Sequence, residues 1–342
     1  MTLPKTHSAI QLTDPGPSPT VSLNSNIPLP TLQNGHVLVK NTYAGINYIE
    51  NYFISGIYQA PSDPYTLGRE GEGIIVAVSQ ELAQHLDPTV RDLKVGDRVA
   101  YLQAPAYAQY SAAPVDKVLK LPEGLAEGLG AAVLLQGLTA VTLATVSYPA
   151  KKGDIVLVHA AAGGVGLLLV QYLNKVIGAR VIATASSEEK LALAKESGAE
   201  WAFLYGPSGN EWIEAVKSIP EVKERGGVAG IYDSVGKATF EGGLEVIAVK
   251  GTFVSFGNAS GSVEPFSLSR LTAKNIAILR PQLFPYIRTR AEFTRYVDEL
   301  VRLIYEGTLK VKLKVYPWEN FDQALQDIRS RGTTGKLILK IA

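Results

Sequence analysis

The sequence contains no cysteine, and this absence excludes several kinds of chemistry. Without thiols the chain can form no disulfide, has no thiolate nucleophile and offers no sulfur ligand to zinc. The remaining metal ligands are carboxylates and the four histidines, His7, His36, His85 and His159. We therefore expect no metal site, and redox chemistry would have to come from a bound organic cofactor.

An excess of charge of either sign is also missing. The chain has 33 basic and 32 acidic residues, so no overall field attracts nucleic acid or an anionic membrane. The first residues lack the apolar core and cleavage site of a signal peptide. We expect a cytoplasmic protein.

Two long stretches, residues 128–150 and 155–174, contain no Lys, Arg, Asp or Glu. Uncharged apolar runs of this length are typical of membrane spans. However, the first run includes Gln136 and several threonines, and glycines interrupt the second. We interpret both as buried elements of a large core and expect no membrane insertion.

The order of segments indicates two domains. A chain of 342 residues exceeds the roughly 250 to 300 at which one hydrophobic core stops growing. Short β-type segments separated by turns fill the first 125 or so residues, whereas apolar strands alternate with helices from 139 to 278, which is typical of a parallel sheet. We predict an irregular β-rich domain, residues 1–138 with 279–342, and a doubly wound α/β domain, residues 139–278.

The strongest motif is DIVLVHAAAGGVG at residues 154–166, where a buried strand leads through a glycine turn into a helix. Helix N-termini offer free amides and positive potential to phosphate groups. Gly163 and Gly166 take the second and third positions of the dinucleotide fingerprint of a Rossmann fold, and Ala161 replaces the first. We predict that Gly163, Gly164, Val165 and Gly166 bind a dinucleotide.

The segment after the second strand of this domain bears on which dinucleotide binds. NAD sites place an acid there, but this chain has Thr184, Ala185, Ser186 and Ser187. A carboxylate would repel the extra phosphate of NADPH by about 1 to 4 kcal/mol, so its absence favours NADPH. Lys190 can bind that phosphate with Ser186, or it can belong to a solvated first helical turn in which Ser186 and Glu189 form a capping box.

The chain resembles the quinone oxidoreductases related to zeta-crystallin, within the medium-chain dehydrogenase/reductase superfamily. The resemblance spans nearly the whole chain and rests on motifs that occur in the family's order. These are NYIENYFISGIY (47–58), LGREGEG (67–73), VGDRV (95–99), QGLT (136–139), HAAAGGVG (159–166), YDSVG (232–236), VSFGNASG (254–261) and SRGTTG (330–335).

This resemblance implies a Rossmann domain joined to a GroES-like catalytic domain, and it implies roles for individual residues. Asn47 would lie near the nicotinamide, and Tyr52 would either orient and protonate the acceptor or only pack in its cleft. Residues flanking the dinucleotide would be Thr139, Ser234, Val235, Phe256 and Gly257. Residues gripping the adenosine phosphate would be Lys190, Tyr205 and Arg331.

Zinc-dependent relatives carry a Gly-His-Glu where this chain has Gly68, Arg69 and Glu70. Because an arginine cannot replace an imidazole ligand, the expected acceptor is one that needs no Lewis acid. We expect an NADPH-dependent quinone reductase, with a 2-alkenal or enone reductase as the alternative. His159, at the end of the first Rossmann strand, is interpreted as structural.

The resemblance also leaves assembly and a second activity open. It implies a homodimer formed through the late strands of the Rossmann sheet. Some members of the family bind AU-rich RNA, and we retain weak RNA binding as a possible second activity of a near-neutral chain.

Overall fold

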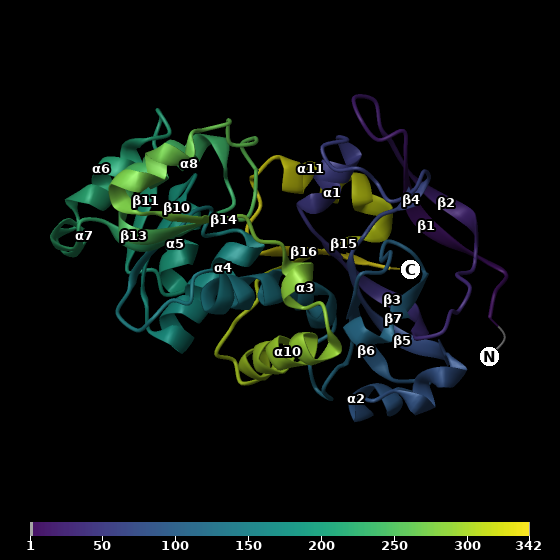
Figure 1. The fold of residues 1–342 in the computed structure, drawn as a ribbon. Helices are drawn as coiled ribbons and strands as arrows, with labels where there is room; N and C mark the ends of the chain where they lie inside the picture. The colour runs from purple at the N-terminus through teal and green to yellow at the C-terminus, as the bar shows by residue number, and fades with distance from the viewer. Residues whose placement is uncertain (1–2, 342) are drawn as a thin grey trace. The chain divides into compact units, whose positions relative to one another are not determined.

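The computed structural model describes residues 3–341, which divide into two compact units. The first unit contains residues up to 135 together with 288–295 and 311–341. The second contains residues 136–287 and 296–310. Figure 1 shows the course of the chain, with the yellow C-terminal strands returning to the sheet built by the N-terminal segments.

The first unit is built on two β-sheets. Its seven-stranded sheet has the order β15-β16-β3-β5-β6-β8, with β7 also pairing with β3, and a smaller sheet has the order β2-β1-β4. All pairs are antiparallel except β15 with β16. The strands are β1 (Thr6–Thr13), β2 (Thr20–Pro28), β3 (His36–Ile46), β4 (Tyr65–Thr66), β5 (Glu70–Val78), β6 (Arg98–Leu102), β7 (Tyr110–Pro114), β8 (Val118–Lys120), β15 (Leu313–Pro317) and β16 (Lys336–Lys340).

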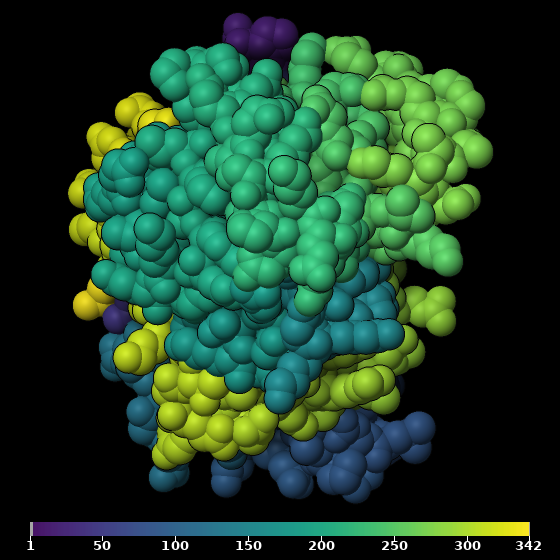
Figure 2. All heavy atoms as spheres, turned by 90° about the vertical axis from the view of Figure 1, so that its left-hand side faces the viewer, coloured from purple at the N-terminus to yellow at the C-terminus, as the bar shows by residue number. Residues whose placement is uncertain are grey.

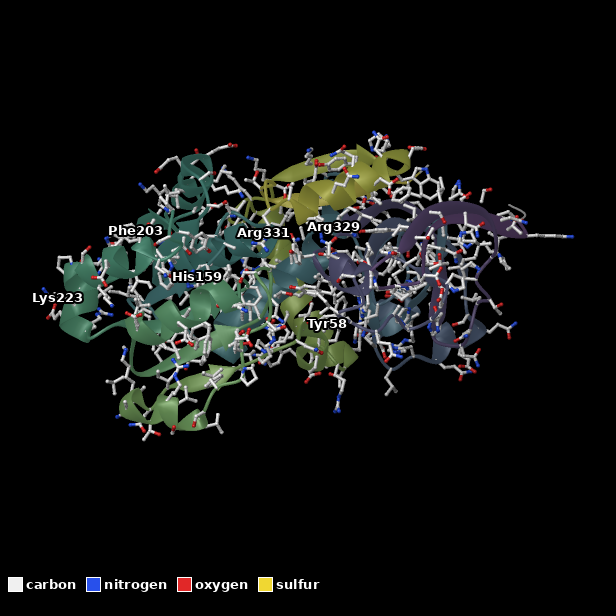
Figure 3. All side chains as sticks on the ribbon, turned by 90° about the horizontal axis from the view of Figure 1, so that it is seen from above. Tyr58, His159, Phe203, Lys223, Arg329 and Arg331 are labelled. Atoms are coloured by element: carbon white, nitrogen blue, oxygen red, sulfur yellow. The ribbon has the colours of Figure 1, made fainter. Side chains whose placement is uncertain are left out.

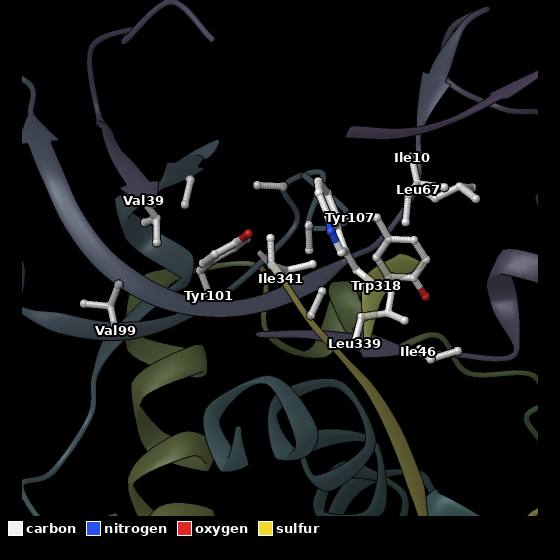
Figure 4. Packing of buried hydrophobic residues seen from close by; sticks show 14 of the residues in the cluster. Ile10, Val39, Ile46, Leu67, Val99, Tyr101, Tyr107, Trp318, Leu339 and Ile341 are labelled. Carbon is white, nitrogen blue, oxygen red and sulfur yellow. The ribbon is translucent and has the colours of Figure 1, made fainter. Parts of the chain in front are cut away.

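Short helices connect these strands, and side chains from distant parts of the chain fill the core between them. The helices are α1 (Ile49–Ile54), η1 (Gln80–Gln84), α2 (Pro88–Arg91), η2 (Val115–Lys117), η6 (Trp318–Asn320) and α11 (Phe321–Arg329). Figure 4 shows part of the core, in which Tyr107 and Trp318 are packed among aliphatic side chains of β3, β6 and β16. The C-terminal strand therefore completes a core that the N-terminal strands begin.

The second unit contains a six-stranded parallel sheet with the order β11-β10-β9-β12-β13-β14. Chain order reverses between β9 and β12, which is the topological switch point of a doubly wound fold. The strands are β9 (Ile155–Val158), β10 (Arg180–Ala185), β11 (Trp201–Leu204), β12 (Val228–Asp233), β13 (Ile247–Ser255) and β14 (Ala277–Leu279). The predicted fold class, a doubly wound α/β fold joined to a β-rich fold, is confirmed.

Helices and loops cover this parallel sheet, and Figure 2 shows their teal and green side chains on one outer face. The helices of the second unit are α4 (Gly164–Gln171), α5 (Glu188–Glu196), α6 (Glu211–Ser218), α7 (Pro220–Arg225), α8 (Lys237–Val246), η5 (Leu268–Lys274) and α9 (Leu283–Tyr286), with π-helical turns η3 (Leu143–Ser147) and η4 (Tyr172–Ile177). Two helices, α3 (Leu129–Thr142) and α10 (Arg290–Tyr305), have residues in both units.

One helical segment of the described chain, Leu129–Ser147, is long and apolar enough to cross a membrane. Its most apolar window is 72% buried within the protein, however. Because core helices pass the same test of length and composition, this segment is weak evidence of a membrane span.

Candidate dinucleotide and acceptor sites

The glycine turn lies between β9 and α4, as the motif predicts. All four residues of β9 are buried, and α4 begins at Gly164 with Gly163 as its N-cap. The first intrahelical bond runs from the Leu167 amide to the Gly163 carbonyl at 2.9 Å. The amides of Gly164, Val165 and Gly166 precede it, so they lack intrahelical acceptors and are suited to phosphate oxygens.

Close packing in this turn explains the glycine at its end. A Cβ atom on Gly166 would lie 2.5 Å from the Ala160 carbonyl oxygen and 2.7 Å from the Ala161 carbonyl carbon. Both are backbone atoms, which cannot move aside cheaply. Gly166 therefore lets the helix start directly against the preceding loop, as the fingerprint requires.

A tyrosine hydroxyl fixes the other end of the turn. The Ala160 amide donates to Tyr205 Oη at 2.8 Å, and Thr184 Oγ1 donates to the same oxygen at 3.2 Å. Ala160 has a φ of 50°, a left-handed conformation that costs about 1 to 3 kcal/mol and persists only where the surrounding structure holds it. Tyr205, predicted to bind the adenosine phosphate, thus also holds the turn. Because its oxygen accepts both of these hydrogen bonds, its hydroxyl proton is left to donate to a ligand.

His159, labelled in Figure 3, stacks on this tyrosine and is buried, which agrees with the structural interpretation. Its Nδ1 is 2.7 Å from Thr184 Oγ1, and its ring stacks on Tyr205 and meets Trp212 edge to face. Burial lowers its pKa to about 3, so the ring is neutral at ordinary pH. A neutral imidazole here supports Thr184 and Tyr205 and adds no charge to the site.

The residues after β10 take a slightly different arrangement from the predicted one. The N-cap of α5 is Ser187, whose hydroxyl accepts from the Lys190 amide at 3.4 Å, so the predicted capping box of Ser186 and Glu189 is wrong. Ser186 is thereby left outside the cap, and Lys190 Nζ donates to its hydroxyl at 3.0 Å. An ammonium and a hydroxyl are thus held together just past the strand.

A buried carboxylate organises the loop after β12. Asp233 accepts from the amides of Val235 at 2.6 Å and Gly236 at 3.2 Å, and from Thr239 Oγ1 at 2.9 Å. Burial raises its pKa to about 6, against the opposing effect of these hydrogen bonds. The carboxylate therefore sets the path of Ser234 and Val235, which are predicted to flank the dinucleotide.

The loop after β13 is joined to the loop after β12 through its backbone. The Phe256 amide donates to the Asp233 carbonyl at 2.7 Å, and the Ala259 amide donates to the Ser234 carbonyl at 3.1 Å. Arg280 donates to the carbonyls of Ser255 and Gly257 at 3.1 and 3.0 Å. Arg280 thus acts within the second unit, where it supports the predicted cofactor residues Phe256 and Gly257.

These segments all follow the carboxyl ends of parallel strands, so they lie along one edge of the sheet. In doubly wound folds, ligands bind outside this edge at the switch point, which here lies between β9 and β12. The edge combines the free amides of α4 with the Ser186 and Lys190 pair. The residues present therefore fit a dinucleotide.

The QGLT motif lies on α3, before β9. Thr139 faces partly to solvent, and Gln136 is buried with an Oε1 atom that has no hydrogen-bond partner in the described residues. A Cβ on Gly164 would collide with the Gln136 amide, so α3 approaches the start of α4. Gln136 is therefore a further residue at the phosphate-binding turn.

In the first unit, helix α1 carries the predicted acceptor residues. Tyr52 lies between two other tyrosines, with ring centroids 5.4 Å from Tyr48 and 4.9 Å from Tyr58. All three rings are partly exposed. They form a tyrosine cluster suited to stacking against a flat, electron-poor ring.

Asn47, just before α1, is buried in a charged cluster. Its amide nitrogen donates to Glu70 Oε1 at 2.8 Å and to the Gly45 carbonyl at 3.2 Å, and its Oδ1 accepts from Lys336 Nζ at 2.7 Å. Both amide protons are therefore already used within the protein. Only a second lone pair of Oδ1 remains for a ligand.

A second buried acid lies near this cluster. Glu50 is fully buried; its Oε2 accepts from the Gly68 amide at 3.4 Å, and its Oε1 has no partner among the described groups. Burial raises its pKa to about 7, although Arg69 and Lys336 act in the opposite direction. Across residues 3–341, no three His, Asp or Glu side chains gather as a metal site.

Arg331, the last predicted phosphate residue, lies on the loop between α11 and β16, and Figure 3 shows it close to Arg329. The backbone of Arg331 has a φ of 56°, which residues other than glycine rarely adopt. Such strained residues cluster at functional sites. The structural roles of Lys336 and Asp233 were missed in the sequence. The sequence holds one signal for each: Lys336 directly precedes the apolar run 337–339, and Asp233 ends an apolar strand.

Comparison with known proteins places the chain in a family. Residues 33–123 match the alcohol dehydrogenase GroES-like domain, and residues 164–302 match the zinc-binding dehydrogenase family. The chain is 41% identical over 333 residues to a probable quinone oxidoreductase of Schizosaccharomyces pombe, covering 96% of both proteins. It is 31% identical to a 2-haloacrylate reductase of a Burkholderia species, covering 89% of this chain and 90% of that protein.

Solved structures agree with these matches. The Escherichia coli quinone oxidoreductase complexed with NADPH superposes with a TM-score of 0.88 at 33% identity, covering 97% of this chain and 99% of that one. The resemblance noted in the motifs is thereby confirmed across both units. The chain belongs to the quinone oxidoreductases of the medium-chain dehydrogenase/reductase superfamily, and it is an oxidoreductase.

Proposed function

We propose that the protein is an NADPH-dependent quinone reductase that works without a metal ion. The observation that carries the cofactor choice is the pair of Ser186 and Lys190, 3.0 Å apart after β10, where an NAD site places an acid. A phosphate arriving there gains charge-assisted hydrogen bonds from the ammonium and the hydroxyl. The E. coli relative complexed with NADPH supports the same choice.

The bound nicotinamide supplies a hydride. This chain binds and orients its carrier through the amides of Gly164, Val165 and Gly166, and through the loops that hold Ser234, Val235, Phe256 and Gly257. Tyr52 orients the acceptor, and its hydroxyl donates a proton to the oxygen that gains negative charge. Thr139 and Arg331 complete the proposed contacts with the dinucleotide.

The residue types favour an acceptor that needs no Lewis acid. Arg69 stands in the motif where zinc-dependent relatives have a histidine, and the chain has no cysteine ligands. A quinone spreads the incoming charge over its ring and oxygens, so a hydroxyl donor suffices. The tyrosine cluster of Tyr48, Tyr52 and Tyr58 offers a surface on which a flat ring can stack.

A conjugated enone or acrylate is the second candidate acceptor. The observation that favours it is the 31% identity with a 2-haloacrylate reductase. Such a substrate also accepts hydride without a metal, at the carbon β to its carbonyl group. A panel of para-quinones, ortho-quinones, 2-alkenals and 2-haloacrylates would rank the acceptors by kcat/KM.

The test of the cofactor proposal is a comparison of NADPH with NADH. The pure protein is mixed with each dinucleotide and a quinone, and loss of reduced nicotinamide absorbance is followed. We expect kcat/KM to favour NADPH, and Lys190→Met to lower this preference by about tenfold, the effect of one lost charge-assisted contact. Equal turnover of both dinucleotides by the unmodified protein would refute the phosphate site.

We also propose that the protein is a homodimer. Strand β14 is short, partly exposed and at the edge of the parallel sheet, so its outer side offers unpaired backbone groups to a second copy. Light scattering after size exclusion measures the mass directly. A monomer mass at micromolar concentration would contradict the proposal. Binding of AU-rich RNA stays a prediction.

A further inference from the structure

We propose that Lys336, Glu70 and Asn47 form a positioning triad for this reaction. The triad fixes helix α1, which carries Tyr52, relative to the loop 330–335, which carries Arg331. This inference rests on the proposed function, because it assigns the triad to the proposed acceptor and phosphate residues.

The three side chains form a closed set of short contacts. Lys336 Nζ lies 2.5 Å from Glu70 Oε1 and 2.7 Å from Asn47 Oδ1, and Asn47 Nδ2 lies 2.8 Å from the same Glu70 oxygen. The other carboxylate oxygen of Glu70 accepts from the Leu135 amide at 2.8 Å. Every neighbour of Glu70 in this set is a donor, so both carboxylate oxygens face hydrogen-bond donors and Lys336 is the opposite charge beside them.

Each member of the triad lies where a segment begins. Asn47 follows β3 and precedes α1, Glu70 is the first residue of β5, and Lys336 is the first residue of β16. None of the three side chains is more than 2% exposed. One ammonium group thus joins segments that are 266 and 289 positions apart in the sequence.

The loop that carries Arg331 ends on Lys336. The Lys336 amide donates to the Lys312 carbonyl at 2.8 Å, and Gly335 takes a φ of 66° to reach this position. At the other end of the loop, Arg329 Nε donates to Asn51 Oδ1 on α1 at 2.7 Å. The loop is therefore tied to α1 on both sides, and Figure 3 shows Arg329 and Arg331 at its start.

Stability alone does not explain a buried ion pair. Burial removes water from both charges, and neutral side chains of similar size usually serve stability as well or better. The ion pair instead fixes a single geometry, because the Lys336 ammonium must contact Glu70 Oε1 and Asn47 Oδ1 at the same time. The triad therefore has the properties of a positioning device, and it needs no contact with the substrate.

The test uses the double variant Lys336→Met, Glu70→Gln, because Lys336→Met alone would leave an unpaired buried carboxylate. In the double variant, the carbonyl oxygen of the new amide at position 70 can accept from the Leu135 amide, Asn47 Nδ2 keeps the Gly45 carbonyl, and no unpaired charge is left buried. The matched control is Lys340→Met, an exposed lysine on the same strand. Both proteins are compared with the unmodified chain by thermal melting, dinucleotide titration and steady-state kinetics.

We expect the double variant to melt with the control, to bind NADPH about tenfold more weakly and to lose about 10- to 100-fold in kcat, the scale of a displacement near 1 Å. Its affinity for NADH, which lacks the phosphate that Arg331 is proposed to contact, should fall less than its affinity for NADPH. The inference would be overturned if the double variant had the kcat and the NADPH affinity of the control. It would also be overturned if the double variant melted at a lower temperature and lost affinity for NADH and NADPH equally. Failure of the unmodified protein to turn over any quinone would instead remove the proposed function.

Discussion

Tyr205 holds the glycine turn and is also predicted to bind the adenosine phosphate, and one substitution tests both roles. Its oxygen accepts from the Ala160 amide at the strained start of the glycine turn and from Thr184. The same hydroxyl is proposed to donate to the adenosine phosphate. A group that shapes the binding turn and also contacts the ligand should affect stability and affinity together.

We expect Tyr205→Phe to lower the free energy of unfolding by about 1 to 3 kcal/mol, because the Ala160 amide loses its acceptor. NADPH affinity should fall in the same variant. Urea unfolding and fluorescence titration measure the two effects, with the exposed Tyr305→Phe as control. A variant that unfolds like this control would show that the hydroxyl does not hold the turn.

Glu50 makes stability depend on pH in a predictable direction. Its pKa is raised by burial from 4.5 to about 7, so the folded protein holds this proton more tightly than the unfolded chain does. The resulting stabilisation is fully present below pH 4.5 and is lost as the pH rises through 7. Its full size is roughly 3 kcal/mol at 1.36 kcal/mol per pKa unit.

Glu50→Gln cannot ionise, so it should gain stability relative to the unmodified protein as the pH rises from 5 to 8. Urea unfolding at both pH values gives the difference, in which the other titrating groups cancel. Glu123→Gln, an exposed acid of the same unit, serves as control. The same relative stability at both pH values would mean that Glu50 is ionised throughout.

At the scale of elements, the connection from β9 to α4 depends on two glycines for different reasons. A Cβ on Gly166 would meet backbone atoms at 2.5 and 2.7 Å, whereas a Cβ on Gly163 would meet only the Ala160 oxygen, at 3.3 Å. Gly166 is therefore needed by the protein itself. Gly163 leaves space that a phosphate group would occupy.

We expect Gly166→Ala to lower the free energy of unfolding by about 1 to 3 kcal/mol, as overpacking does. Gly163→Ala should unfold like the unmodified protein but bind NADPH weakly. Each variant is the other's control in melting and titration experiments. The assignment fails if Gly163→Ala binds NADPH normally, or if Gly166→Ala melts unchanged.

Elements could be predicted from the sequence where the residues that specify them are neighbours along the chain. The run 154–166 specifies a buried strand, a turn and a helix start through local pattern, and the structure has all three. The cap of α5 was misplaced by one residue because Ser186 and Ser187 are both capable of capping. The triad of Lys336, Glu70 and Asn47 was not predictable, because no local pattern pairs residues 266 positions apart.

At the scale of the whole molecule, the chain leaves the first unit after residue 135 and returns to complete it. Strand β16 lies between β15 and β3, inside the seven-stranded sheet, and Leu337, Ile338 and Leu339 are buried. Trp318 and Phe321 join the same core. The first unit therefore depends on residues at the far end of the sequence.

We expect a chain ending at residue 310 to leave the first unit unfolded. Trp318, Phe321, Leu337, Ile338 and Leu339 alone, at about 1.5 to 3 kcal/mol each, contribute on the order of 10 kcal/mol, as much as the whole stability of a typical domain. Differential scanning calorimetry of the truncated and full-length chains measures this loss. A truncated chain with the full-length unfolding enthalpy would contradict it.

The late return of β16 also constrains the order of events on the ribosome. The parallel sheet ends at β14, at residue 279, so all of its strands are synthesised while the first unit still lacks a central strand. The edge of β3 that will receive β16 stays open throughout that interval. A nascent chain stalled at this stage presents an unpaired strand edge, which is prone to aggregation. We therefore expect a chaperone that shields such edges to assist the folding of this chain.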